Sequence, residues 1–435
     1  MAGLDPSPPV HIKEYSRQHP AVGIALGDLG HDAAAAAVRD GKVLFAIEEE
    51  RLNRHKHYMG SPRLAVGACA KAAGVAIDAM KLSYYLDPSN ARLTERADAF
   101  TRVLGSEVRA AVEGDFAHVQ ALIAEAVEPW HGVQPVNHHL AHAASAFYLS
   151  GFSRSLVLVI DGQGESASTT LMLGDERGLH PIKQYPITSS LGILYAAVTA
   201  YVGFEPIEDE YKVMGLAAYG TSDDYRAFFD EIIIEEQDGG FSIPSLLTPA
   251  RARLPAWMRK LGAPRFSAEQ PIEPRHIAIA YSLQKAVEPT VLRLLEHHES
   301  RLKTRHLCLA GGVALNCSMN GVLDRSTLFD ALFVQPAAND PGAALGSAVH
   351  SYYDAHPEGP RHRMEHTYLG PSYDDADVRR ALAEFAGKVT WTKPNDYIGA
   401  VADLLAEGKV FGWFQGRMEF RPRALGNRSI RAVPI

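Results

Sequence analysis

The sequence predicts an α/β protein in which two similar lobes face each other across a cleft. Two stretches carry this prediction, "AVGIALGDLGHDAAAAAVRDGKVLFAIEEE" (21–50) and "SLVLVIDGQGESASTTLMLGDERGLHPIKQY" (155–185). In each, three apolar runs are separated by a Gly-containing turn and a polar turn, which is typical of three consecutive antiparallel strands. A helical pattern follows each copy. Strands and helices that pack around one core form a lobe, so the two copies predict two lobes.

The first strand of each copy ends in an aspartate. Asp28 and Asp161 occupy equivalent positions, each followed by a glycine-containing turn. Ligands bind preferentially in crevices between such units, where strand ends and turns provide polar groups. We therefore expect these turns and their acidic side chains to line the cleft.

The rest of the two lobes follows from hydrophobic periodicity and glycine positions. Pro289 lies inside one helical stretch and is expected to kink or split it, because proline lacks the N–H that continues a helix. The predicted segments are a helical stretch over 95–130, an amphipathic helix over 277–302, a strand–Gly-Gly–helix unit over 305–323 and a strand–loop–helix unit over 331–356.

The two ends of the chain differ from this pattern. Residues 1–20 are polar with four prolines and read as a flexible leader. A Pro-, Asp- and Arg-containing stretch at 356–378 marks a boundary, so the duplicated lobes are assigned to 21–375 and a linker with an incomplete domain to 376–435. Residues 392–435 are expected to supply one helix, one strand and a basic loop, which is too little apolar surface for a separate core.

Composition excludes several classes of protein. The formal net charge of −8 argues against broad binding of nucleic acid or anionic membranes, although it leaves room for a local basic patch. Three cysteines are too few for a disulfide framework. We find neither an apolar run of membrane-span length nor a signal peptide, and so expect a soluble cytoplasmic protein of enzyme size.

A histidine cluster opens the Ala-rich helix predicted in "VNHHLAHAASAFYLSG" (136–151). His138 and His142 are four residues apart and lie on one helix face, as half of a metal site or simply as a polar helix start. With Asp161 and Asp340, each after an apolar strand, they would supply two nitrogen and two oxygen ligands, which suits iron, manganese or zinc. The pattern is not that of HExxH zinc proteases, since no glutamate follows His138.

Three weaker signals concern anions. The glycines at 311 and 312 let backbone N–H groups approach a phosphate, although a diglycine turn is often only a tight connection. "EEERLNRHKHYMGSP" (48–62) is either a solvated charged loop or an anion clamp in which Lys56 is a point charge. "EPIEDEYKVMGLAAYG" (205–220), with Lys212, reads as turn and loop.

Taken together, these motifs resemble the O-carbamoyltransferase family that includes nodulation protein U and the cephamycin, tobramycin and ansamycin carbamoyltransferases. The resemblance covers residues 21–430. Its motifs are "HDAAAAAVRDGKVLFAIEEERLNRHKH", "NHHLAHAASAF", "VIDGQGE", "SLGILYAAVTAYVGF", "DEYKVMGLAAYG", "LAGGVALNCSMNG", "PAANDPGAALGSA" and "GRMEFRPRALGNRSI". Glycine is usual in the family where Tyr211 and Arg421 stand here.

The resemblance implies duplicated ribonuclease-H-like lobes of the actin/hexokinase type around a cleft, followed by the start of a YrdC-like α/β domain. In this family the YrdC-like domain makes carbamoyladenylate from carbamoyl phosphate and ATP. The duplicated lobes hold a divalent metal, most often Fe²⁺, and pass the carbamoyl group to a hydroxyl of a small molecule. We expect this chain alone to transfer carbamoyl from supplied carbamoyladenylate but to make little or none itself.

The resemblance also implies roles for individual residues. His138, His142, Asp161 and Asp340 match the metal ligands. His31 matches a catalytic histidine near the acceptor, suited to removing its proton because imidazole titrates near neutrality. Lys56 matches a catalytic residue that contacts carbamoyladenylate. Further matches are Gly162, Gly164, Lys212, Gly215, Gly311, Gly312, Val313 and Asn316 at the nucleotide, and Arg417 and Arg423 at the opening of the YrdC-like domain.

Two alternatives stay open at this stage. One is transfer of a larger acyl-adenylate to tRNA, against which the net charge weighs. The other is a non-catalytic remnant that binds nucleotide and metal. The expected partners are a small-molecule hydroxyl acceptor and a second copy in a homodimer, with neither nucleic acid nor membrane.

Overall fold

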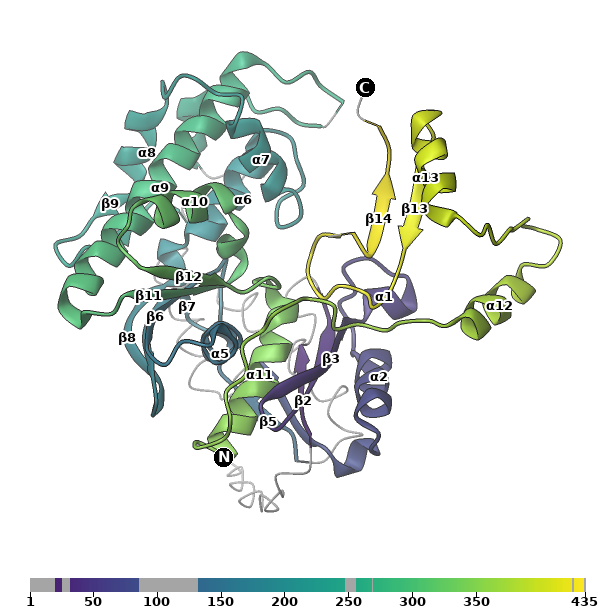
Figure 1. Ribbon diagram of the computed structural model, residues 1–435. Coiled ribbons are helices and arrows are strands. Elements are labelled where there is room, and N and C mark those ends of the chain that lie inside the picture. Colours follow the sequence, from purple (N-terminus) through teal and green to yellow (C-terminus); the bar gives the residue numbers. More distant parts are fainter. Residues whose placement is uncertain are drawn as a thin grey trace, which may run out of the picture.

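The fold is seen in a computed structural model that describes residues 20–25, 32–85, 132–246, 256–267, 269–424 and 426–433 (Figure 1). Asp28, His31, the predicted leader up to residue 19 and the whole of the predicted helical stretch at 95–130 lie outside the described residues. Within them, no helix has the length and apolar character needed to cross a bilayer.

The first lobe is built on a five-stranded mixed sheet of order β3-β2-β1-β4-β5. β1 pairs antiparallel with β2, and β2 with β3, as the first copy of the repeat predicts. β1 pairs in parallel with β4, and β4 with β5. The strands are β1 Ala21–Ala25, β2 Ala34–Arg39, β3 Lys42–Glu48, β4 Lys81–Tyr85 and β5 Gln134–Val136.

The second lobe repeats this topology. Its sheet has the order β12-β11-β6-β7-β8, with β6–β7 and β7–β8 antiparallel and β6–β11 and β11–β12 parallel. The strands are β6 Ser155–Ile160, β7 Ala167–Asp175, β8 Gly178–Pro186, β11 His306–Ala310 and β12 Ala331–Val334. The predicted fold class, two duplicated α/β lobes, is therefore confirmed.

Two helices, α5 (His138–Ser150) and α11 (Asp340–Ala355), pack against each other between the sheets. α11 contacts β1, β2 and β4, whereas α5 contacts β6, β7 and β11. Their small residues allow a close approach, since a Cβ on Gly346 would lie 1.7 Å from the carbonyl oxygen of Ala141. The sheets and these two helices share one core of buried residues, from Ala21 to Phe420.

The second lobe carries most of its helices on the other face of its sheet. α9 is one continuous helix of 29 residues, so of the two outcomes expected at Pro289, a kink or a split, the split is wrong. Proline leaves the carbonyl four residues earlier without its helical donor. That carbonyl belongs to Lys285, and it accepts a hydrogen bond from Arg226 Nη1 at 2.7 Å. These helices are α6 Leu191–Tyr201, α7 Glu210–Ala217, α8 Arg226–Ile232, α9 Pro274–Leu302 and α10 Cys317–Arg325.

The segment 205–220 also differs from its prediction as turn and loop, because α7 forms inside it. Val213, Leu216 and Ala217 are buried against the second-lobe core, which favours the helix over the polar local sequence. All three cysteines are free, as the sequence predicts. The smaller elements are α1 Glu50–Asn53, α2 Arg63–Ala73, β9 Ile234–Glu235, β10 Phe241–Ser242 and 3₁₀ turns at Ile77–Ala79, Ile187–Ser189, Ala256–Leu261 and Gly312–Leu315.

The last elements of the chain, in yellow in Figure 1, stand beside α1 and the first lobe. Instead of one helix, one strand and a loop over 392–435, the structure forms a second strand that pairs with the first. Neither of the two C-terminal helices buries a residue. These elements are α12 Asp375–Glu384, α13 Tyr397–Ala406, β13 Phe411–Phe414 and β14 Arg428–Arg431.

Candidate metal centre

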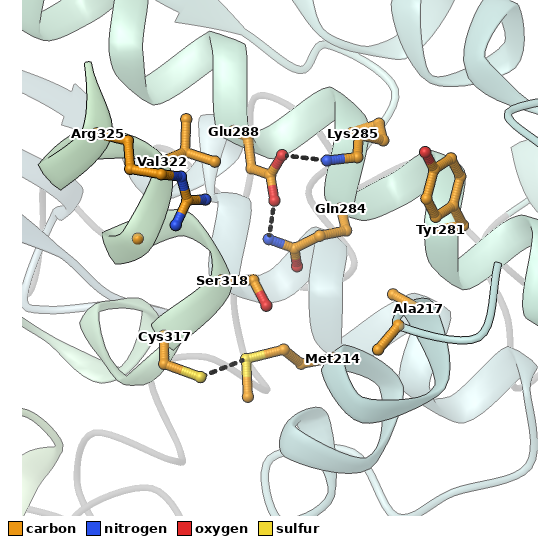
Figure 2. A pocket seen from close by; sticks show the side chains of 12 residues that line it. Met214, Ala217, Tyr281, Gln284, Lys285, Glu288, Cys317, Ser318, Val322 and Arg325 are labelled. Atoms are coloured by element: carbon orange, nitrogen blue, oxygen red, sulfur yellow. Dashed lines mark hydrogen bonds and ion pairs between the residues drawn. The ribbon is translucent and has the colours of Figure 1, made fainter. Parts of the chain in front are cut away.

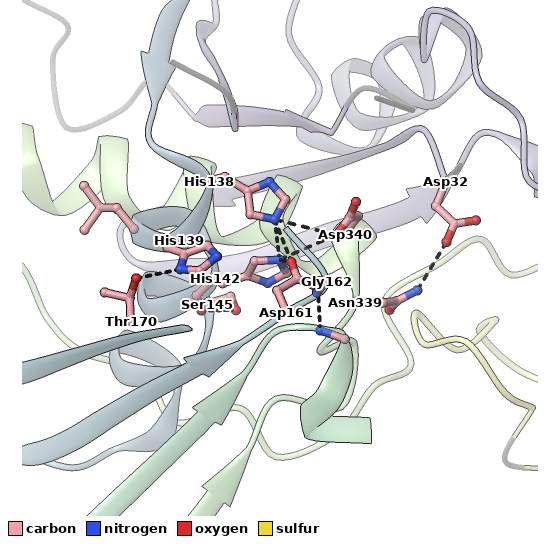
Figure 3. A network of polar contacts seen from close by, with 12 residues as sticks. Asp32, His138, His139, His142, Ser145, Asp161, Gly162, Thr170, Asn339 and Asp340 are labelled. Atoms are coloured by element: carbon pink, nitrogen blue, oxygen red, sulfur yellow. Dashed lines mark hydrogen bonds and ion pairs between the residues drawn. The ribbon is translucent and has the colours of Figure 1, made fainter. Parts of the chain in front are cut away.

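Two histidines and two aspartates converge where the lobes meet (Figure 3). His138 and His142 project from the first turns of α5, which begins after Asn137, whose side chain accepts a hydrogen bond from Leu140 N at 3.1 Å. Asp161 directly follows β6, and Asp340 is the first residue of α11. The sequence predicts these four residues as one ligand set. The packing of the strands and of α5 against α11 is what brings the two carboxylates to the histidine pair.

The four side chains aim one atom each at a common centre. His138 Nε2 lies 2.8 Å from Asp161 Oδ2 and 3.1 Å from His142 Nε2. Asp340 Oδ1 lies 3.8 Å from His138 Nε2 and 3.6 Å from His142 Nε2. Four ligands at about 2.1 Å from a tetrahedral ion are about 3.4 Å from one another. The observed separations bracket this value, so the residues fit a divalent metal ion.

Without an ion, the charges of these groups depend on one another. Burial lowers the pKa of His142, but its interactions with Asp161 and Asp340 outweigh burial and raise the pKa to about 9. The pKa of His138 is raised in the same way, with Asp161 outweighing burial. Burial would raise the pKa of Asp161, but both imidazoles hold it well below its ordinary value. These shifts favour a protonated histidine in the metal-free site, so a metal ion that binds there competes with a proton.

Neighbouring groups hold the histidine end of the site in place. Glu165 accepts hydrogen bonds from His138 N at 2.8 Å and from Asn137 Nδ2 at 2.7 Å. His139 points away: its Nδ1 lies 2.6 Å from Thr170 Oγ1, and burial lowers its pKa to about 3. His139 is thus a neutral core residue, as its position on a different helix face predicts.

The Gly311–Gly312 turn touches the same aspartate. Asp161 Oδ1 accepts hydrogen bonds from Gly312 N at 3.1 Å and from Gly162 N at 2.8 Å. Gly311 has φ +88°, and a Cβ there would lie 2.3 Å from the carbonyl oxygen of Ile160. Glycine is required at this position, and the turn lies directly beside the metal-ligand set.

Other predicted nucleotide residues have structural partners. A Cβ on Gly164 would lie 2.8 Å from His139 Cδ2, so this glycine makes room for the neighbouring ring. Asn316 is buried and caps α10 by accepting from Met319 N at 3.0 Å. Val313 packs, partly buried, against the second-lobe core. Gly215 lies on α7 with open space where a Cβ would be.

A pocket of about 370 Å³ lies between α7, α9 and α10 (Figure 2). Gln284 and Glu288 on α9 are joined by a hydrogen bond of 3.0 Å, and Lys285 Nζ lies 2.8 Å from Glu288 Oε2. Gln284 also donates to Asn316 Oδ1 at 3.1 Å, which connects the pocket wall to the glycine turn. The residues that line the pocket are Met214, Ala217, Ala218, Tyr281, Gln284, Lys285, Glu288, Cys317, Ser318, Gly321, Val322 and Arg325.

The predicted basic residues do not form one cluster. Lys56 Nζ is exposed and lies 3.6 Å from Glu208 Oε2 of the second lobe. Lys212 Nζ lies 2.7 Å from Oδ2 of Asp209, the residue that precedes the first turn of the same helix, α7. Arg423 stacks on the Tyr211 ring, 3.5 Å from its centroid, and so links the C-terminal segment to α7.

Arg417 is bound to backbone rather than free for a ligand. Its guanidinium donates to the carbonyl oxygens of Leu44 at 3.0 Å, Leu369 at 2.6 Å and Gly370 at 3.0 Å. It therefore fastens the C-terminal segment to β3. The catalytic assignment of His31 lies outside the described residues and stays a prediction.

Sequence reasoning missed the α9 wall of the pocket and the pair formed by Asp32 and His57. The residues of the wall are three and four apart on one helix, a spacing that also fits an ordinary amphipathic helix. Asp32 and His57 belong to motifs that the sequence singled out, but their contact joins segments 25 residues apart. Nothing local in the sequence signals that pairing.

Comparison with known proteins adds five findings. The Carbamoyltransferase N-terminus family profile matches residues 21–349, and the Carbamoyltransferase C-terminus profile matches 402–435. Nodulation protein NolNO of Sinorhizobium fredii is 39% identical over 93% of this chain, which spans 58% of that protein. 3'-Hydroxymethylcephem-O-carbamoyltransferase of Amycolatopsis lactamdurans is 25% identical, covering 93% of this chain and 72% of its own. Component A of Acidaminococcus fermentans (R)-2-hydroxyglutaryl-CoA dehydratase aligns with TM-score 0.41 and 14% identity, covering 78% of this chain and 99% of its own.

Proposed function

Because this chain belongs to the carbamoyltransferase family, we propose that it transfers a carbamoyl group from carbamoyladenylate to a hydroxyl group of a small molecule. The observation that carries the proposal is the shared position of Asp161. This one carboxylate faces both histidines of the candidate metal centre and accepts from the N–H of Gly312. A phosphate-bearing donor at the glycine turn would therefore lie beside the metal ligands.

The chemistry of the four ligands suits Fe²⁺, Mn²⁺ or Zn²⁺, since imidazole and carboxylate are ligands that these ions share. When bound, such an ion neutralises phosphate charge and polarises the carbonyl carbon under attack. His138 and His142 would hold it from α5, and Asp161 and Asp340 from the second sheet and α11. Glu165, which accepts from His138 N, keeps the start of α5 in register for this task.

The pocket between α7, α9 and α10 fits the nucleoside part of the donor. It has about the volume that small-ligand sites require, and its wall residue Gln284 donates a hydrogen bond to Asn316, which ends the turn that the two glycines begin. Gln284, Lys285 and Glu288 offer donors and acceptors to ribose hydroxyls or to the base. The exposed ammonium of Lys56 would attract the phosphate from the first lobe.

In the proposed reaction the acceptor oxygen attacks the carbamoyl carbon, the bond from that carbon to the phosphate oxygen breaks, and AMP leaves with the electron pair. The hydroxyl proton passes to a base of the protein. The donor itself would be made from carbamoyl phosphate and ATP. The net charge of −8 favours a small acceptor over tRNA.

The experiment that tests this function supplies synthetic carbamoyladenylate and a primary alcohol, 3'-hydroxymethylcephem, to the metal-loaded chain. We expect carbamate product and AMP in equal amounts by mass spectrometry. A panel of sugars and tRNA tested beside it identifies the acceptor class. Tight binding of carbamoyladenylate without product from any acceptor would instead support a non-catalytic binding protein.

A further inference from the structure

Three parts of the chain meet where the loop of residues 203–209 leads into α7. Lys56 Nζ of the first lobe lies 3.6 Å from Glu208 Oε2, and His57 Nε2 lies at the same distance from that oxygen. From the C-terminal segment, the guanidinium of Arg423 lies 3.5 Å from the centroid of the Tyr211 ring, in the first turn of α7. The start of α7 is therefore tied to the first lobe and to the C-terminal segment at once.

The C-terminal side of this contact has a fixed base. Phe420 is buried in the core that the two sheets share, and its N–H donates to the carbonyl oxygen of Thr367 at 2.8 Å. The carboxylate of Glu419 is also buried, and it accepts from Asn427 N at 2.8 Å. That hydrogen bond closes the loop that carries Arg423. The guanidinium thus reaches the second lobe from a loop that is anchored in the core.

The α7 side of the contact forms a wall of the pocket. Met214 and Ala217 project from this helix into the pocket lining (Figure 2). Met214 Sδ lies 3.7 Å from Sγ of Cys317, the first residue of α10, on another wall. A thiol is a weak donor and a thioether a weak acceptor, so this contact holds the two walls together only weakly. A movement of α7 would therefore change the width of the pocket.

The loop before α7 has an uncommon backbone conformation. Ile207 has φ +75°, and its side chain is exposed. A positive φ is unfavourable for residues other than glycine, and most of all for a β-branched one. Its N–H donates to Glu210 Oε1 at 2.6 Å, within the same turn. Such conformations persist where the surrounding structure fixes them, and they gather at switch regions and sites that clamp a ligand. We therefore expect this loop to relax when its contacts are removed.

We propose that Tyr211 and Arg423 form a clasp that holds α7 closed over the pocket and so retains the carbamoyl donor during transfer. This inference rests on the proposed function, in which the pocket takes the nucleoside part of carbamoyladenylate. In the closed arrangement the guanidinium lies over the phenol ring, whose face attracts a cation. Opening separates the two groups and lets nucleotide enter or AMP leave. Both are positioning residues, because they act through α7.

The size of the effect follows from the exposure of the pair. A cation over an aromatic ring shifts an equilibrium by about two- to fivefold at exposed sites and by about thirtyfold when desolvated. Tyr211 is 42% exposed, so we expect about fivefold. Lys212 Nζ also lies 5.7 Å from the centroid of this ring. Because Lys212 belongs to α7 and moves with it, that contact is the same in the open and closed arrangements.

The first experiment measures the affinity and dissociation rate of AMP on the immobilised, metal-loaded chain by surface plasmon resonance. We expect Tyr211→Leu and Arg423→Met each to speed AMP dissociation about fivefold with unchanged metal content. Tyr211→Phe, which keeps the ring, should stay near the parent chain. The matched control is Tyr219→Leu, at an exposed tyrosine just past the other end of α7, and it should match the parent chain. The double variant Tyr211→Leu/Arg423→Met should show the same fivefold effect, because both changes remove one contact.

Dissociation of AMP at the parent rate from either single variant would overturn the proposal, as would single effects that multiply in the double variant. A second measurement, made without nucleotide, follows hydrogen exchange of the α7 backbone amides by mass spectrometry. We expect faster exchange in Tyr211→Leu and Arg423→Met but not in Tyr219→Leu, and unchanged exchange would refute the clasp. If the parent chain binds no AMP, the proposed donor site fails, and hydrogen exchange then still decides whether the pair holds α7.

Discussion

The metal-free site should make stability depend on pH in an unusual direction. His142 is fully buried, and its pKa rises from 6.5 to about 9 in the folded chain because Asp161 and Asp340 outweigh burial. A folded pKa above the unfolded one gives stability that is complete below pH 6.5 and is lost as the pH rises through about 9. At 1.36 kcal/mol per pKa unit, the loss is about 3 kcal/mol.

The measurement is urea unfolding of the chain after chelation, at pH values from 6 to 9.5, with His142→Asn as the comparison. We expect the advantage of the parent chain over the variant to shrink by about 3 kcal/mol across this range. Saturating metal should remove the pH dependence, since the cation replaces the proton. An advantage that stays constant with pH, or that grows, would show that the imidazole is not protonated in the apo site.

The other predictions concern packing and the pocket. Gly346→Ala should destabilise the chain by more than about 3 kcal/mol in urea unfolding, because its Cβ would lie 1.7 Å from Ala141 O, whereas Gly67→Ala, with no atom within 4 Å, should be neutral or stabilising. Ser318→Trp should fill the pocket and weaken AMP binding at least about tenfold by calorimetry without loss of metal. Arg226→Ala should cost about 1–3 kcal/mol, since it leaves the carbonyl opposite the α9 proline without its donor.

The duplicated sheets could be predicted from sequence because their first three strands are local hairpins. Alternating apolar runs and Gly/Asp turns fix such pairings over short distances. The pairing of the parallel strands β4, β5, β11 and β12 could not be predicted, since their partners are far along the chain. The continuity of α9 past Pro289 also depends on a distant residue, Arg226, which no local pattern contains.

The residues of the candidate metal set could also be predicted from local patterns, but their distances from one another could not. Two histidines at helical spacing can be read directly, and aspartates after apolar strands are natural companions. The pocket wall could not be predicted, because α7, α9 and α10 meet only through tertiary packing. The pairing of Asp32 with His57 could not be predicted for the same reason, since the two residues are 25 positions apart.

The central claim is that the buried histidine–aspartate set holds a metal ion, and metal analysis of the purified chain tests it most directly. After loading with Fe²⁺, Mn²⁺ or Zn²⁺ and removal of free ion, we expect about one ion per chain in the parent protein and in the control His139→Gln. His138→Ala combined with His142→Ala should lose it, because two of four ligands are removed. Equal occupancy in the parent chain and the double variant would contradict the account.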